Sequence, residues 1–304
     1  MSRSTRGYVI AMVGIAFWSA TAVFIGYLVT RHGMAPLQLA FWRDALAALG
    51  LAAALTITRR TALRVPRAHL RFLLAYGLVL SLFNSIWTVA VKLSGAGVAT
   101  VLAYSSAGFT VLLARILYGE RLRLPKVMAV ILSLSGCVLV AGAYDLEMWR
   151  RNPLGIGAGL FSGLLFAIYG LMGRENERRK LNSWSSMVVT FGLAAALLAL
   201  YNGIPALQAM GLAGARLVPA LPPAGWLALV VLAFIPTLLG YGLYNASMKY
   251  LPVTTVNLLA TSEPVMTGVQ AYLLLGERWT GLQLAGSALI LTALVFVRLG
   301  EERG

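Results

Sequence analysis

Long apolar stretches alternate with short polar connections along almost the whole chain. Each stretch has about the 20 residues that an α-helix needs to cross the hydrocarbon core of a bilayer. The pattern predicts helices at 7–30, 36–57, 70–91, 95–118, 125–143, 153–173, 184–201, 224–247, 253–275 and 281–299. We therefore expect an all-α membrane protein with ten transmembrane helices.

The composition agrees with lipid as the main solvent. Of the 304 residues, 59% are hydrophobic and only 12% are charged, whereas soluble domains carry about 25% charged residues. So few charged side chains cannot cover a soluble protein of this size. Arg3, Arg6 and the small residues around Thr21 are similar to a cleaved signal peptide, but the apolar run continues to Val29. We expect this first helix to be retained.

The basic residues indicate how the helices are oriented. With ten spans both termini lie on one side, and the connections on that side hold eighteen Lys and Arg residues against six on the other, with Arg43 inside a helix. Basic residues gather in cytoplasmic loops, so both termini are predicted to be cytoplasmic in an inner-membrane protein. Because the net charge of +15 is spread among these connections and not over one face, we expect no nucleic-acid partner.

The chain repeats itself at an offset of 157 residues. Residues 117–121 (LYGER) recur as residues 274–278 (LLGER), and Lys92 matches Lys249 at the same offset. This predicts two five-helix repeats, residues 1–148 and 149–304. An odd number of helices in each repeat inverts the second one in the membrane, as in many secondary transporters.

These repeats carry a family resemblance. The segments are Gly119-Glu120-Arg121 and Gly276-Glu277-Arg278, Glu263-Pro264, Phe41-Trp42-Arg43 and Phe17-Trp18-Ser19-Ala20. Together they resemble EamA-type members of the drug/metabolite transporter superfamily, including bacterial exporters of aromatic and neutral amino acids. The first repeat departs from the pattern, with Ser106-Ala107 where the second has Glu263-Pro264. The resemblance implies alternating access around a central cavity.

Motifs of other function classes are missing from the sequence. No Lys follows a Gly, so a phosphate-binding Gly-Lys loop cannot form, and the two histidines lack metalloprotease spacing. The single cysteine, Cys137, lies in an apolar stretch and is expected to be an inert core thiol. We expect a non-enzyme without cofactor, metal or ATPase subunit, and the oligomeric state stays open.

Charged residues within the predicted helices are candidates for function, because each costs about 2.5–3.5 kcal/mol to insert at mid-helix. Arg43 can bind a substrate carboxylate or tie helices together, and Asp44 is expected to be a plain partner for a polar group of another helix. Glu263, followed by the helix-breaking Pro264, is a candidate for proton coupling or for a gate.

Polar and aromatic residues at membrane depth complete the predicted substrate site. An aromatic ring suits an apolar side chain, and amides and hydroxyls suit a zwitterionic head group. The predicted substrate-binding residues are Trp18, Arg43, Ser81, Asn84, Trp87, Tyr104, Ser105, Tyr169, Tyr241, Tyr244, Asn257 and Thr261. Five of them are expected to face the substrate directly: Trp18, Asn84, Tyr104, Tyr241 and Asn257.

The function expected from these features is export of small metabolites, foremost neutral or aromatic amino acids. One mid-membrane cation is too few for sugar phosphates or nucleotide sugars, which need several cationic partners. The alternatives are a broad-specificity drug or metabolite carrier and, in other classes, a polytopic membrane enzyme, a lipid scramblase or a channel.

Overall fold

The computed structural model describes residues 3–58, 66–94, 96–119, 123–140, 142–145, 147, 152–275 and 280–302. Within these ranges the chain forms helices and connections, with no strand. The Glu-Arg pairs at 120–121 and 277–278, which contribute to the family resemblance, lie outside the described residues.

The first half of the chain forms the following helices. They are α1 (Arg3–Trp18), α2 (Thr21–Gly26) with the π-helical segment η1 (Tyr27–Arg31), α3 (Pro36–Thr58), the 3₁₀ segment η3 (Arg67–His69) with α4 (Leu70–Ser94), α5 (Ala96–Ala103), α6 (Ser106–Tyr118) and α7 (Leu124–Val140).

The second half forms a similar series. Its helices are α9 (Pro153–Arg178), α10 (Ser183–Asn202), α11 (Pro205–Ala209), α12 (Pro223–Leu232) with the π-helical segment η4 (Ala233–Leu239) and α13 (Gly240–Ser247), α14 (Val253–Ala260), α15 (Glu263–Leu275) and α16 (Gly281–Glu302).

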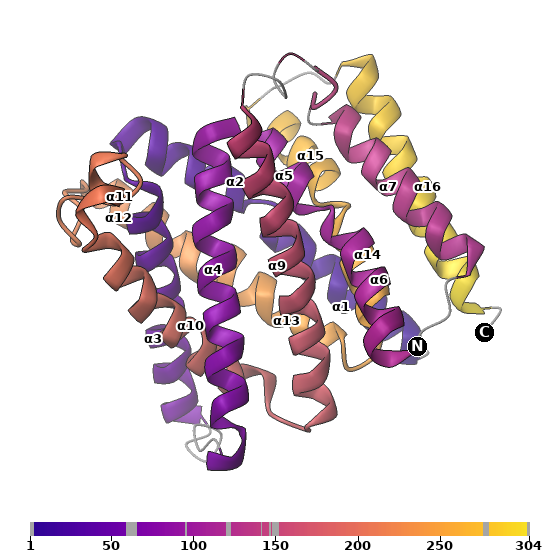
Figure 1. Ribbon diagram of the computed structural model, residues 1–304, viewed down its shortest axis with the longest axis horizontal. Helices are drawn as coiled ribbons and strands as arrows, with labels where there is room; N and C mark the ends of the chain where they lie inside the picture. The colour runs from indigo at the N-terminus through magenta and orange to yellow at the C-terminus, as the bar shows by residue number, and fades with distance from the viewer. Residues whose placement is uncertain are drawn as a thin grey trace.

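Seven of the described helical segments are long and apolar enough to cross a membrane, and two shorter apolar helices lie at 124–140 and 281–296. The remaining predicted span, 253–275, is divided into α14 and α15. The all-helical prediction is thus confirmed, while ten crossings, the inverted repeat and the side of the termini remain predictions. In Figure 1, α1 begins and α16 ends at the lower right, and α11 lies at the upper left.

Small residues let the helices approach closely. A Cβ at Gly163 of α9 would lie 2.9 Å from the Leu102 carbonyl oxygen of α5, and Gly136 of α7 lies similarly close to Gly286 of α16. Backbone contact of this kind drives helix association in lipid, where the hydrophobic effect between helices is absent. The resulting bundle packs α4 against α9 and α10, α3 against α10, and α7 against α16 (Figure 1).

Two helices are interrupted at corresponding positions. α5 gives way to α6 at Tyr104 and Ser105, and α14 gives way to α15 at Thr261 and Ser262, which are the same positions at the 157-residue offset. The second interruption is supported by α7: the Ser133 and Thr261 hydroxyls lie 2.8 Å apart, and the Cys137 thiol donates to the Thr261 carbonyl at 3.7 Å. Interrupted helices are tolerated in a membrane where the freed backbone groups find such partners.

Candidate functional site

A cavity of about 1420 Å³ lies at the centre of the bundle. Its walls come from α1, α2, α3, α4, α5, α9, α13 and α15, and its mouth is lined by the connections at 32–36 and 213–221. The mouth is therefore at the end of the molecule opposite the beginning of α1, because α1 ends at the cavity and α2 and η1 continue to the mouth.

Aromatic rings form the floor of the cavity. Trp18 at the end of α1 stacks on Tyr241 with ring centroids 4.6 Å apart, and it meets Phe166 edge to face at 5.5 Å. Phe83 stacks on Phe166 at 5.1 Å, and all four residues line the cavity. The floor is mostly apolar and suits a flat or branched apolar side chain.

A second aromatic layer closes the bundle behind this floor. The Tyr76 hydroxyl donates to the Asn245 Oδ1 at 3.4 Å, and the Asn245 Nδ2 donates to the Tyr169 hydroxyl at 3.0 Å. Tyr169 and Tyr244 are fully buried and contact the floor, with Tyr244 meeting Trp18 at 5.5 Å. The cavity is consequently closed on the side where α1 begins.

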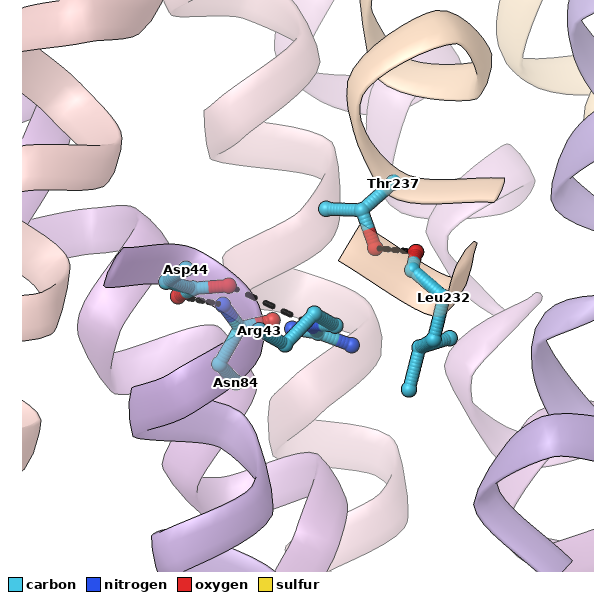
Figure 2. Close-up of polar contacts among 5 residues, drawn as sticks. All are labelled: Arg43, Asp44, Asn84, Leu232 and Thr237. Carbon is cyan, nitrogen blue, oxygen red and sulfur yellow. Dashed lines mark hydrogen bonds and ion pairs between the residues drawn. The ribbon is translucent and has the colours of Figure 1, made fainter. Parts of the chain in front are cut away.

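The wall formed by α3 and α4 carries a buried polar cluster, shown in Figure 2. The Arg43 Nε donates to the Asp44 Oδ1 at 3.1 Å, and the Asn84 Nδ2 donates to the Asp44 Oδ2 at 2.7 Å. Asp44 is completely buried and joins the two helices, as expected, whereas Arg43 and Asn84 line the cavity. Successive residues of a helix point about 100° apart, which explains why only one of the two charged neighbours faces the cavity.

Another part of the cavity wall lies beside the two helix interruptions. The Tyr104 hydroxyl donates to the Glu263 Oε2, and both residues line the cavity. Pro264 occupies the first turn of α15, where a missing backbone N–H costs nothing. The helix therefore breaks before Glu263, at 261–262, and not at the proline.

The structure brings seven of the predicted residues to one cavity. They are Trp18, Arg43, Asn84, Trp87, Tyr104, Tyr241 and Glu263. The remaining predicted residues, all of them described, lie outside its lining: Ser81, Ser105, Tyr169, Tyr244, Asn257, Thr261 and Pro264. Asn257, expected to face substrate, is fully buried and its Oδ1 accepts from the Ser106 hydroxyl at 3.0 Å. Asn257 therefore faces α6 and not the cavity. The sequence pattern alone does not show which face of this helix meets the cavity.

Several lining residues were missed from the sequence. They include Phe83, Phe166, Gln38, Thr88, Thr100 and the residues of 213–221. Phe166 lies three positions before Tyr169 and Phe83 adjoins Asn84, so helical spacing offered a signal, but an apolar ring within a span is most often packed or lipid-facing. The 213–221 connection offered none, because its position over the mouth is set by tertiary contacts such as the 2.6 Å bond from the Gln38 Nε2 to the Arg216 carbonyl.

Comparison with known proteins supports one family. The profile of the EamA-like transporter family matches residues 5–142 and again residues 153–299. A "Probable amino-acid metabolite efflux pump" of Escherichia coli is 28% identical over 300 residues, which cover 96% of this chain and 94% of that relative. A relative of the same name from Salmonella typhimurium is 28% identical and covers 94% of this chain and 92% of its own length.

The fold is shared with a solved protein. A crystal structure with 21% sequence identity superposes with a TM-score of 0.78 over 98% of each chain. The two family matches together cover most of the sequence. The chain therefore belongs to the EamA-like transporter family.

Proposed function

We propose that the protein exports neutral or aromatic amino acids by alternating access through the central cavity. The observation that carries the proposal is the lining of that cavity, where an aromatic floor adjoins a polar wall with a cationic side chain, Arg43, and an amide, Asn84. An amino acid with an apolar side chain carries one charge of each sign and one apolar group. The names of the Escherichia coli and Salmonella typhimurium relatives agree with this substrate class.

The proposed orientation places this structure in the transport cycle. With both termini cytoplasmic, the mouth at 32–36 and 213–221 faces outward, and the layer of Tyr76, Tyr169 and Asn245 separates the cavity from the cytoplasm. The two repeats, residues 1–148 and 149–304, would then rock against each other in the inner membrane. Substrate enters after this inner layer opens and leaves through the mouth.

Glu263 is proposed to couple this cycle to protons. The interruption beside it has its own support in Ser133 and Cys137, and Pro264 lies where a helix tolerates proline. Glu263 is thus not needed to hold the broken helix, which favours coupling over a purely structural gate. A carboxyl group in the cavity that can exchange its proton for substrate would provide the coupling.

A broader carrier is the second candidate. The cavity volume of about 1420 Å³ exceeds the roughly 300–1,000 Å³ typical of small-molecule sites, and it would accept ligands larger than an amino acid. Such a carrier would also accept apolar cations and dyes that have no carboxylate.

Counterflow into proteoliposomes tests the proposal. Vesicles loaded with unlabelled phenylalanine, leucine or threonine should accumulate the same labelled amino acid transiently and saturably. Labelled dyes and apolar cations should accumulate poorly. Equal uptake of dyes and amino acids would favour the broader carrier, and uptake that never saturates would indicate a channel or scramblase.

A further inference from the structure

Two polar atoms of the buried cluster have no hydrogen-bond partner among the described residues. They are the Arg43 Nη2, a donor, and the Asn84 Oδ1, an acceptor. Both side chains are nine-tenths or more buried, with 3% and 1% of their surface exposed, and both line the cavity. A buried donor or acceptor without a partner is costly, so such atoms point to a ligand that supplies one.

The hydrogen bonds to Asp44 determine which atoms of Arg43 and Asn84 remain without a partner. A carboxylate only accepts hydrogen bonds, so the amide nitrogen of Asn84 must face Asp44 and the amide oxygen must face away from it. The Nε of Arg43 is likewise committed to Asp44, and the far end of its guanidinium points away from the carboxylate (Figure 2). A donor and an acceptor are thereby held beside each other by one shared carboxylate.

The head group of an α-amino acid complements this pair. Its carboxylate accepts hydrogen bonds, its ammonium donates them, and the two groups are joined through one Cα, with the ammonium nitrogen about 2.5 Å from the carboxylate carbon. The Arg43–Asp44 pair is neutral as a unit, so a zwitterion adds no net charge to this low-dielectric wall. An acidic or basic substrate head group would add one.

We infer that Arg43 and Asn84 form a zwitterion site, with the substrate carboxylate on the Arg43 Nη2 and the substrate ammonium on the Asn84 Oδ1. Asp44 acts as the positioning residue behind both. This inference rests on the proposed function and deepens it, because it leaves Glu263, whose Oε2 is already bound by Tyr104, free of the substrate. Trp18, Tyr241 and Phe166 then receive the side chain.

Equilibrium binding of labelled phenylalanine to the purified full chain in detergent tests the assignment without requiring transport. Phenylalaninamide lacks the carboxylate and N-acetylphenylalanine lacks the ammonium. Each should compete at least about tenfold more weakly than phenylalanine, as expected when one hydrogen-bonded charge is lost. Equal competition by either analogue would overturn the assignment.

Two variants test the carboxylate contact at Arg43 and the ammonium contact at Asn84 separately. Arg43→Gln combined with Asp44→Asn removes the guanidinium without leaving an unpaired buried carboxylate, and the amide oxygen introduced at position 44 can still accept from the Asn84 Nδ2. This double variant should lose most of the discrimination against phenylalaninamide while keeping that against N-acetylphenylalanine. Asn84→Ala should show the opposite pattern. The matched control is Arg179→Gln with Glu175→Gln, which removes an exposed ion pair of 2.9 Å at the end of α9 and should leave both ratios unchanged.

The outcomes distinguish this inference from the export proposal. Binding with the expected ratios but no counterflow would refute export and retain the site. If amino acids show counterflow but both variants discriminate against the two analogues as strongly as the wild type does, the zwitterion site is refuted and the export proposal is retained. A protein that binds no phenylalanine would refute the site directly.

Discussion

The hydrogen bond between Tyr104 and Glu263 joins the two interrupted helices across the cavity wall. In lipid a charged carboxylate is expensive unless it is paired or hydrogen-bonded, and the tyrosine hydroxyl supplies one such bond. Protonation of Glu263 changes its hydrogen bond with the Tyr104 hydroxyl, because a carboxylic acid can donate as well as accept. A change in the protonation of Glu263 would therefore change the contact between the two interrupted helices.

Glu263→Gln should abolish proton-driven uphill export while leaving downhill exchange intact, since a neutral amide mimics only the protonated acid. The measurement is accumulation of labelled phenylalanine in proteoliposomes with and without an imposed pH gradient. Glu175→Gln, at a half-buried carboxylate of α9 outside the cavity lining, serves as the control and should behave as wild type. Unchanged gradient-dependent accumulation in Glu263→Gln would remove the coupling role.

At the scale of single elements, the π-helical segment η4 shows how a proline is accommodated inside a span. Pro236 has no N–H for the carbonyl of Leu232, four residues earlier, and the Thr237 hydroxyl donates to that carbonyl at 2.8 Å instead (Figure 2). Thr237 is 1% exposed, so water cannot replace it. The bond keeps the segment between α12 and α13 ordered beside Arg43.

Thr237→Val should destabilise the protein by about 0.5–1.5 kcal/mol, because it removes a buried hydrogen bond to the Leu232 carbonyl. In a Pro236→Ala background the backbone N–H returns and the same Thr237→Val change should cost much less. Thermal unfolding in detergent of the two single variants and the double variant measures this coupling. Additive effects would show that the hydroxyl does not compensate for the proline.

The contact between α9 and the interruption of α5 and α6 depends on a glycine. A Cβ at Gly163 would lie 2.3 Å from the Ser105 Oγ and within about 3 Å of two backbone carbonyls, whereas a Cβ at Gly157 of the same helix meets nothing within 4 Å. Gly163→Ala should lower the unfolding free energy by about 1–3 kcal/mol through overpacking. Gly157→Ala should leave it unchanged or raise it by up to about 1 kcal/mol.

Thermal unfolding of Gly163→Ala and Gly157→Ala tests this prediction, with phenylalanine counterflow as a second readout. The prediction requires a clear difference between them, because both make the same chemical change on the same helix. Equal melting temperatures would mean that the close approach of α9 to Leu102, Ala103 and Ser105 is not needed for stability.

At the scale of the whole molecule, hydropathy predicted the helical segments well because a membrane span must satisfy its own backbone. At the 157-residue offset Tyr104 corresponds to Thr261, and a helix is interrupted at each of these two positions. What the sequence could not supply was which face of each helix meets the cavity. Asn257 and Tyr104 are both polar residues at membrane depth, yet only Tyr104 lines the cavity.

The central claim is that this cavity is where the amino acid binds. In a Cys137→Ser background, which keeps a hydrogen-bond donor toward Thr261, Thr100→Cys places a thiol on the cavity wall and Ser133→Cys places one in a fully buried contact outside the lining. A membrane-impermeant thiol reagent added from outside should modify the cysteine at 100 and not the one at 133. Phenylalanine should slow the reaction at 100 in proportion to its occupancy of the site, and a rate at 100 that saturating phenylalanine leaves unchanged would contradict the account.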